Sequence, residues 1–180
     1  MNTSIQSFEE LQRLEKLISK IQNKARVEQI ATVKSKDQNY PLYSIEFGTQ
    51  DLSKPTLGLI GGVHGLERIG TQLAISYLEH LFEIMDWDED THKRLQECRI
   101  VSIPLLNPGG MAMGMRCNPN GVDLNRNAPI EATEKPAFLL GGHRFSPKLP
   151  WYRGAANQGM ELEAEALCKV TRERIFPSKA

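Results

Sequence analysis

Residues 57–72 read LGLIGGVHGLERIGTQ, and this stretch decides the fold. It begins with apolar, branched side chains, breaks at Gly61-Gly62 and continues with the spacing of an amphipathic helix. It therefore predicts a buried strand, a tight corner and then a long helix. Two polar residues, His64 and Glu67, lie at the corner.

A corner that carries these two side chains suits a metal ion. The imidazole of His64 and the carboxylate of Glu67 are donors that Zn²⁺ accepts, and the glycines let the backbone turn beneath the ion. A catalytic zinc usually has three protein ligands and a water, so the pair does not complete a site. The same spacing also fits an ordinary helix start, with Glu67 at the positive end of the helix dipole.

The chain as a whole has 180 residues, which suits a single domain over residues 1–180 with its own core. Its 22 basic and 22 acidic residues cancel, so we expect neither nucleic acid nor an anionic membrane as a partner. The three cysteines lack Cys-x-x-Cys spacing, and neither a basic leader nor an apolar membrane span is present. We therefore expect a cytoplasmic protein.

The chain before the corner predicts a helix and a hairpin. Ser7 and Glu10 form a capping-box pattern ahead of apolar residues at helical spacing, which favours a helix over about residues 7–24. Residues 26–35 and 42–48 alternate between apolar and polar side chains, with a polar turn between them that contains proline.

The chain after the corner predicts a parallel strand pair. Apolar residues at spacings of three and four extend the helix to Met85, and residues 99–105 form the next buried strand, which Asn107-Pro108-Gly109-Gly110 ends. The expected fold is α/β, with a mixed, largely parallel twisted sheet flanked by helices. Ligands bind beyond the carboxyl ends of such strands, where His64 and Glu67 would meet the loop after Leu106.

The loop over residues 113–127 carries a second polar group. It contains Arg116, Asp123, Asn125 and Arg126 but few apolar side chains, so burial alone does not explain it. Guanidinium and amide groups match carboxylates and oxyanions, as an anionic substrate end or a developing oxyanion would require. A carboxylate such as Asp123 can accept the second ring N–H of a zinc-bound histidine.

HGLE at residues 64–67, followed by NPGG, an isolated arginine and GVDLNRN at 121–127, resembles the zinc carboxypeptidase family, the M14-type metallocarboxypeptidases. The resemblance covers about residues 55–127 well and residues 158–176 loosely. It implies that His64 and Glu67 are two zinc ligands with Asp123 behind His64. It also implies that Arg116 stabilises the oxyanion, and that Asn125 and Arg126 bind the terminal carboxylate of a peptide. The implied reaction is attack of zinc-bound water on an amide carbonyl.

The family pattern is incomplete in this chain. The third zinc ligand, a histidine on a later strand, and the general-base glutamate have no visible counterpart, so we expect a domain incomplete at its C-terminal side with weak zinc binding and slow or absent hydrolysis. His143 lies at a different position from the third ligand, beside Arg144, and is not expected to bind the metal. The missing strands would leave an apolar sheet edge, which favours self-association. A helix capped by Asn157 is expected to run to Pro177.

Two other functions remain open from the sequence. A zinc-dependent deacylase of small N-acyl amino acids, similar to aspartoacylase and succinylglutamate desuccinylase, would use the same His-x-x-Glu and arginines. A non-catalytic module would keep only the carboxylate-binding Asn125 and Arg126. Comparing activity on peptides that have a free C-terminus with activity on N-acyl amino acids separates a deacylase from a carboxypeptidase. Peptide binding without zinc would identify the non-catalytic module.

Overall fold

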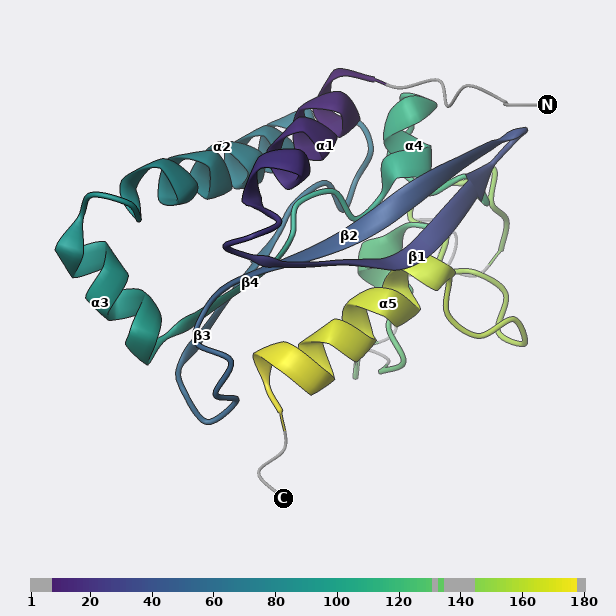
Figure 1. The fold of residues 1–180 in the computed structure, drawn as a ribbon. Helices are drawn as coiled ribbons and strands as arrows, with labels where there is room; N and C mark the ends of the chain where they lie inside the picture. Colours follow the sequence, from purple (N-terminus) through teal and green to yellow (C-terminus); the bar gives the residue numbers. More distant parts are fainter. Residues whose placement is uncertain (1–7, 131–132, 135–144, 178–180) are drawn as a thin grey trace.

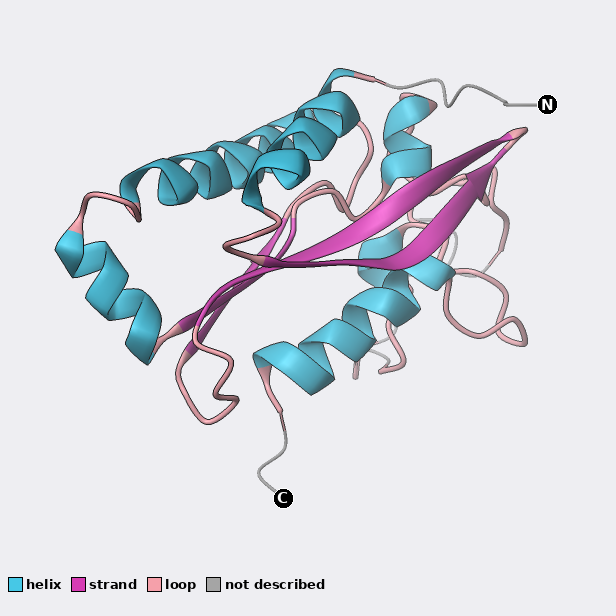
Figure 2. Cartoon of the chain, viewed as in Figure 1, coloured by secondary structure: helices cyan, strands magenta, loops and turns pink. Residues whose placement is uncertain are grey.

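The structure, a computed structural model, describes residues 8–130, 133–134 and 145–177. In these residues a four-stranded sheet of order β1-β2-β4-β3 is flanked by helices (Figures 1 and 2). The strands are β1 (Arg26–Ser35), β2 (Gln38–Gly48), β3 (Thr56–Ile60) and β4 (Arg99–Ile103). The helices are α1 (Glu9–Ile21), α2 (Arg68–Ile84), α3 (Glu89–Glu97), α4 (Pro108–Ala112) and α5 (Leu162–Val170), with a 3-10 turn η1 (Leu124–Arg126) and a π-helical turn η2 (Thr171–Ile175).

The mixed sheet flanked by helices is confirmed. β3 and β4 are parallel, as the strand–helix–strand pattern predicts, and Leu57 pairs with Ile100. The N-terminal hairpin joins this pair through β2, which runs antiparallel to both β1 and β4. The sheet is therefore less parallel than expected in the described residues, because only the β3–β4 pair is parallel.

Helices cover both faces of the sheet. Figure 1 shows α1 and α2 on one side and α5 on the other. The first core cluster contains residues of α1, α2 and the facing side of the sheet, including Leu11, Ile45 and Leu78. The second lies under α5 and includes Val101 and Val170. Every residue of β4 is buried, as expected for a strand with a neighbour on each side.

The hairpin turn is shorter than predicted. β2 begins at Gln38, so only residues 36 and 37 connect the strands, and Lys36 takes a left-handed conformation with φ of 54°. The predicted turn included Pro41, which instead pairs opposite Thr32 within β2. Before Ile45 the described pairing of β2 is with β1 alone, so a proline that lacks an N–H is tolerated there.

Helix α1 forms close to the predicted range, but Glu10 does not act as a capping residue. Ser7 lies outside the described residues. The carboxylate of Glu10, 2 % exposed, pairs with Arg68 and accepts a hydrogen bond from Gln72 at 3.1 Å. Both partners lie on α2, so Glu10 ties α1 to the first turns of the helix that follows the corner.

The ends of the shorter helices differ from expectation. Helix α3 is not predicted, although the Asp88 side chain caps it by accepting from the Thr91 N–H at 3.0 Å. Asn157 does not cap the last helix, because α5 begins at Leu162 and its preceding residue is Glu161. Among the helices described, none combines the length and apolar character needed to cross a bilayer.

Candidate metal centre and substrate site

The corner between β3 and α2 is held by the backbone of the chain after β4. The amide N–H groups of Leu106 and Asn107 donate to the carbonyl groups of Gly61 and Gly62, each at 2.9 Å. Gly62 has a φ of 61°, and a Cβ there would overlap Thr71 Oγ1. Glycine is therefore required where the chain turns from the strand toward His64.

The loop after α4 reaches the corner through a close backbone contact. The N–H of Gly65 donates to the carbonyl of Arg116 at 3.2 Å. A Cβ at position 65 would overlap the backbone of Gly110, Met111 and Met115. The absence of a side chain at Gly65 therefore lets the two segments meet.

The six residues singled out in the sequence come together at this contact. The Nδ1 atom of His64 lies 3.0 Å from Glu67 Oε1, and the Nε2 atom lies 3.2 Å from Asp123 Oδ1. His64 is 6 % exposed and Asp123 1 % exposed. The imidazole is thus fixed between an outer carboxylate on one side and a buried carboxylate on the other.

Arg116 and Asn125 surround the same imidazole. Arg116 Nη2 lies 2.9 Å and Asn125 Nδ2 3.1 Å from His64 Nε2. Arg116 also donates to Glu67 Oε1 at 2.9 Å and to Asp123 Oδ2 at 3.2 Å. One guanidinium therefore bridges the two carboxylates.

Arg126 lies at the outer side of the cluster. Its Nε is 3.8 Å from Asp123 Oδ2, and its guanidinium lies 5.9 Å from the centre of the Trp151 ring. The side chain remains 43 % exposed. Its position is restricted by these two contacts while its remaining donors can reach a ligand from solvent.

The electrostatics of the cluster favour a charged Glu67. A hydrogen bond from the His64 ring, with added attraction from His64 and Arg116, lowers the pKa of Glu67. The Glu67 carboxylate is therefore ionised near neutral pH, which is the form that binds a metal.

The proton on His64 decides which nitrogen can take a metal. When Nε2 carries the proton it can donate to Asp123, and Nδ1 then has a free lone pair that faces the Glu67 carboxylate. When Nδ1 carries the proton, it donates to Glu67, and Nε2 can instead accept from Arg116 or Asn125. Only the first tautomer presents His64 and Glu67 together as donors to one ion.

The geometry fits two of the positions around a zinc ion. Two donors about 2.1 Å from Zn²⁺ lie roughly 3.4 Å apart in a tetrahedral site, so the 3.0 Å separation needs only a small widening. In the described part of the chain no group of three His, Cys, Asp or Glu side chains is placed to hold a metal. His143 lies outside the described residues.

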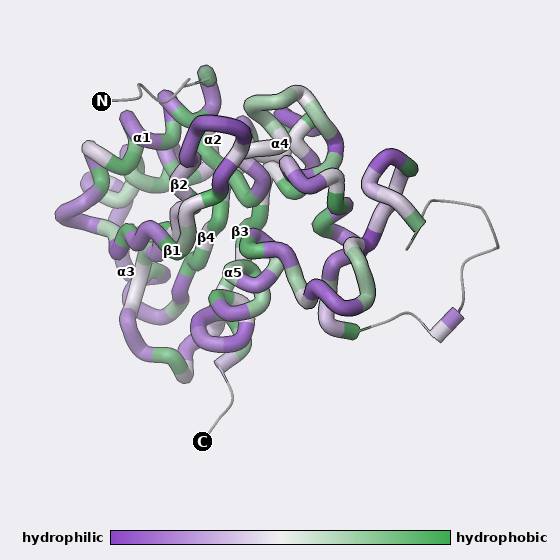
Figure 3. The backbone as a smooth tube through the Cα atoms, turned by 90° about the vertical axis from the view of Figure 1, so that its right-hand side faces the viewer, coloured by the Kyte–Doolittle hydropathy of each residue, from purple (hydrophilic) through white to green (hydrophobic). Residues whose placement is uncertain are grey.

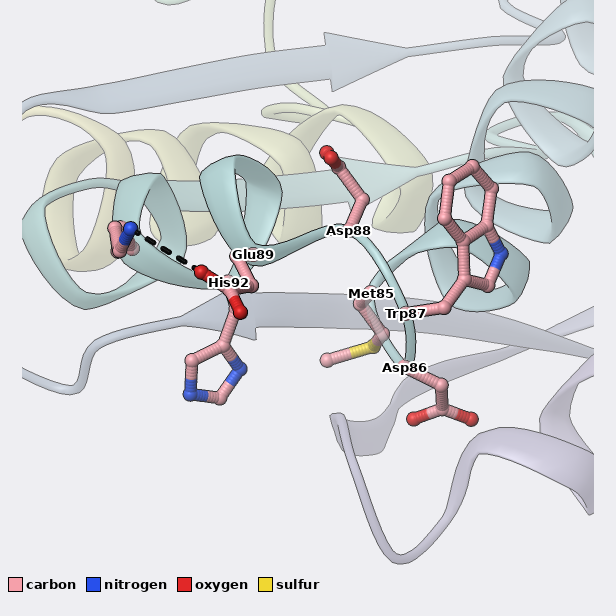
Figure 4. Close-up of a pocket in the computed structure, with 7 residues that line it drawn as sticks. Met85, Asp86, Trp87, Asp88, Glu89 and His92 are labelled. Carbon is pink, nitrogen blue, oxygen red and sulfur yellow. Dashed lines mark ion pairs between the residues drawn. The ribbon is translucent and has the colours of Figure 1, made fainter.

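The remaining described histidines lie away from the corner. His80 is twelve residues beyond the first residue of α2, or about 18 Å along the helix axis. His92 lines a hollow of about 290 Å³ at the α2–α3 connection, together with Asp86, Asp88 and Glu89. Figure 4 shows its ring turned away from the Asp88 carboxylate, while Glu89 pairs with Lys93 at 3.5 Å.

Sequence reasoning missed several residues that hold the site together. Asn107 was interpreted only as part of a strand-ending turn, yet it is fully buried and donates to the Val63 carbonyl at 3.3 Å while capping α4. Asn127 donates to the Arg153 carbonyl at 2.8 Å and accepts from the Glu161 N–H at 2.6 Å. The Asn-Pro pair at residues 107–108 was a usable signal for a capped helix.

Comparison with known proteins identifies the family. The model of the zinc carboxypeptidase family matches residues 11–179. The chain belongs to the zinc carboxypeptidase family. It is 32 % identical over 105 residues to the carboxypeptidase N catalytic chain of Rattus norvegicus, a match covering 49 % of this chain and 23 % of that protein. It is also 33 % identical over 106 residues to carboxypeptidase E of Caenorhabditis elegans, covering 49 % of this chain and 22 % of that protein.

Two solved structures share the fold of this chain. Thrombin activatable fibrinolysis inhibitor superimposes with a TM-score of 0.65 at 18 % identity, covering 91 % of this chain and 42 % of the other. Carboxypeptidase A of Helicoverpa armigera gives a TM-score of 0.59 at 20 % identity, covering 89 % and 40 %. This zinc carboxypeptidase chain spans less than a quarter of the two sequence relatives and less than half of these two structures.

Proposed function

We propose that this chain carries part of the catalytic site of a zinc-dependent metallocarboxypeptidase that removes C-terminal residues from peptides. The observation that supports the proposal best is the double contact of His64. Its Nδ1 lies 3.0 Å from Glu67, and its Nε2 lies 3.2 Å from Asp123. A metal-binding imidazole has this arrangement, with one nitrogen toward the metal and the other held by a carboxylate.

His64 Nδ1 and Glu67 would hold the zinc ion, and a third ligand would come from outside the described residues. When bound, zinc polarises a carbonyl group and lowers the pKa of its water. Asp123 would hold the proton on His64 Nε2 and thereby keep Nδ1 free for the metal. Membership of the zinc carboxypeptidase family supports the metal requirement of the complete site.

Arg116 would stabilise negative charge on the carbonyl oxygen of the substrate. Its side chain is 38 % exposed, and its guanidinium contacts both the His64 ring and the Glu67 carboxylate. A donor aimed at a developing oxyanion contributes most when it is already in place. Its present bond to Glu67 Oε1 would be exchanged for metal and substrate contacts.

Asn125 and Arg126 would bind the terminal carboxylate of the peptide. Both side chains are exposed and lie on η1, next to the buried Asp123. Trp151 and Asp123 restrict the Arg126 guanidinium, so less side-chain entropy is lost when it binds a carboxylate in a bidentate way. This part of the site would then recognise the free C-terminal carboxylate of the peptide rather than its scissile amide bond.

The direct test measures zinc binding to the 180-residue chain by isothermal titration calorimetry. We expect zinc binding that His64→Ala abolishes and that His92→Ala leaves unchanged. His92 is the matched control because it is a histidine of the same chain that lies away from the corner. Equal zinc binding by the two variants would contradict the assigned metal position.

A second measurement tests the substrate. Peptides with a free C-terminal carboxylate are compared with C-terminally amidated peptides, first for binding and then for release of the last residue by mass spectrometry. Arg126→Ala should weaken binding of the free acid tenfold or more, roughly the loss of one charge-assisted hydrogen bond. Equal losses for amidated peptides would contradict the role of Arg126, and turnover of N-acyl amino acids alone would favour a deacylase.

A further inference from the structure

The first turn of α2 carries a charge of the unfavourable sign. Residues 68–71 read RIGT, so the helix begins with Arg68 and its first turn contains no acidic residue. The positive end of the helix dipole lies at this turn and favours negative side chains. An arginine there therefore needs a negative charge from another part of the chain.

Helix α1 supplies that negative charge. The carboxylate of Glu10 forms an ion pair with Arg68 and accepts a hydrogen bond from Gln72 Nε2 at 3.1 Å. Only 3 % of the Glu10 side chain is exposed, against 42 % of the Arg68 side chain. Because a buried carboxylate without a cationic partner is strongly unfavourable, Glu10 holds the Arg68 guanidinium in place.

The Arg68 guanidinium also contacts the start of α1 and the end of α4. It lies 5.8 Å from the centre of the Phe8 ring, and its Nη2 donates to the Met111 carbonyl at 3.4 Å. Phe8 in turn contacts Tyr40 of β2, with the ring centres 6.0 Å apart. Figure 3 shows α2 between α1 and α4. Arg68 therefore joins both neighbouring helices to the first residue of α2.

These contacts fix the backbone beside Glu67. The Glu67 side chain is 59 % exposed, so packing does not set its direction, which depends on the chain at either side. On one side, a Cβ at Gly65 would lie 2.4 Å from the Met111 nitrogen, so the corner rests against α4. On the other side, Arg68 is held by α1 and α4. The backbone that carries the Glu67 carboxylate is thus restrained from both directions.

We propose that the ion pair of Glu10 and Arg68 positions Glu67 for the metal ion, so that α1 supports the metal centre without touching it. The inference rests on the proposed metal-binding role of His64 and Glu67. By fixing the residue after Glu67, the pair keeps its carboxylate next to His64 Nδ1, at 3.0 Å. Glu10 also balances the charge of Arg68, which would otherwise repel a divalent cation bound to the neighbouring residue.

A second ion pair between the same two helices provides a matched control. Arg13 of α1 pairs with Glu79 of α2, and it also donates to Ser76 Oγ at 2.9 Å. Glu79 lies eleven residues beyond Arg68, or roughly 16 Å along the helix axis. The Arg13–Glu79 pair therefore joins α1 to α2 away from the metal corner.

The test compares zinc binding, measured by isothermal titration calorimetry, in two double variants. Glu10→Gln/Arg68→Gln and Arg13→Gln/Glu79→Gln each remove one ion pair between α1 and α2 without changing the net charge or leaving a buried charge unpaired. Circular dichroism first establishes that both are folded at the temperature of the titration. The first variant should bind zinc about 10- to 100-fold more weakly than the wild type, and the second should bind it equally well.

The outcomes separate a positioning role from a structural one. A pair that only joins the two helices would lower the melting temperature of both variants and leave the zinc affinity of the folded protein unchanged. Equal zinc affinities in the two double variants would therefore overturn the proposal. Arg68→Lys keeps the ion pair and should recover part of the affinity, and a loss as large as that of the first variant would also contradict the inference.

His64→Ala distinguishes this inference from the proposed function. If zinc binding survives in His64→Ala, the assigned metal position is wrong, and the role of Glu10 and Arg68 fails with it. If His64→Ala abolishes binding while Glu10→Gln/Arg68→Gln binds zinc as the wild type does, the metal position stands and only the positioning role is refuted.

Discussion

At the scale of single residues, Asp123 connects the whole candidate site. Its buried carboxylate faces His64 and Arg116, each at 3.2 Å, and Arg126 at 3.8 Å, and it accepts from the Asn125 N–H at 3.2 Å. The negative charge of Asp123, which is buried away from water, therefore lies next to two positively charged guanidinium groups.

We expect Asp123→Asn to lower the free energy of unfolding by about 3 kcal/mol, because it removes the buried counter-charge of Arg116 and Arg126 and leaves only the exposed Glu67 beside Arg116. Urea denaturation measures this value. Asp86→Asn is the control, since Asp86 pairs with Lys24 but is 58 % exposed, and the loss there should be below about 1 kcal/mol. Equal losses in both variants would show that Asp123 does not organise the cluster.

Glu163 is a buried acid with an incomplete set of partners. It is 2 % exposed, its Oε2 accepts from Asn118 at 3.4 Å, and its Oε1 has no hydrogen-bond partner among the described residues. Burial, together with the neighbouring Glu161, raises the pKa of Glu163 above 4.5. The folded state thus favours the protonated carboxyl group.

The raised pKa gives a pH-dependent prediction. The destabilisation is fully present above the folded-state pKa, shrinks as the pH falls toward 4.5 and is absent below that pH, where both states are protonated. Glu163→Gln should therefore stabilise the protein at pH 8, by roughly 1–3 kcal/mol, and have little effect near pH 4.5. Urea denaturation of both proteins at the two pH values checks this, and a difference that does not change with pH would contradict it.

The residues proposed to bind zinc and substrate were easier to predict from the sequence than the residues that position them. His64, Glu67, Arg116, Asp123, Asn125 and Arg126 stand out because charged side chains in glycine-rich loops are not explained by burial, and the structure brings all six together. Asn107 and Trp151 act through contacts with other segments. Such contacts depend on the folded arrangement, which no local pattern specifies.

At the scale of elements, the site depends on how closely two loops approach. Gly65→Ala should separate the corner from the loop at 110–116, because its Cβ would meet backbone atoms that cannot move independently. We expect a loss of about 2–3 kcal/mol in the free energy of unfolding and weaker zinc binding.

Gly114→Ala is the matched control for Gly65→Ala. Gly114 has a φ of 63°, but a Cβ there meets no atom within 4 Å, so only the cost of the backbone conformation, about 1–2 kcal/mol, applies. Zinc binding should be retained in this variant. Loss of zinc binding in both variants would show that loop approach does not determine the metal corner.

The predicted elements were correct where regularly spaced apolar residues were followed by a clear boundary signal such as a glycine pair. The strand–corner–helix unit at residues 56–84 forms as predicted because its apolar run and its glycines agree. Helix α3 lacks an apolar stripe, with Leu95 as its only buried residue, so periodicity could not reveal it. Asn157 was wrongly predicted as a cap because no local pattern marks the start of α5. That start is fixed by the contact between Asn127 and the backbone N–H of Glu161.

At the scale of the whole molecule, a buried ionic network joins the C-terminal helix to the sheet. Glu46 of β2 lies 3.3 Å from Arg99 of β4, and both side chains are 3 % exposed. Arg174 of η2 donates to Glu46 at 2.8 Å and to Glu28 of β1 at 2.6 Å. Residues from three strands and the last helical turn thus form one connected group.

Arg174→Gln should loosen the attachment of α5 and η2 to the sheet. The variant leaves Glu46 with Arg99 alone and removes the partner whose hydrogen bond lowers the pKa of Glu28. We expect the free energy of unfolding to fall by about 2–3 kcal/mol at pH 7. Because the hydrogen bond from Arg174 is the main cause that lowers the pKa of Glu28 in the folded wild type, part of this difference should disappear as the pH falls below 4.5.

Hydrogen exchange followed by mass spectrometry locates the effect of Arg174→Gln. Peptides from residues 162–175 should exchange faster, while peptides from α1 keep their wild-type rate, because α1 packs on the opposite face of the sheet. Arg172→Gln is the control, since Arg172 lies on the same helical turn but is exposed. If the two variants changed stability and exchange equally, the charge on this turn, rather than the buried network, would hold the helix to the sheet.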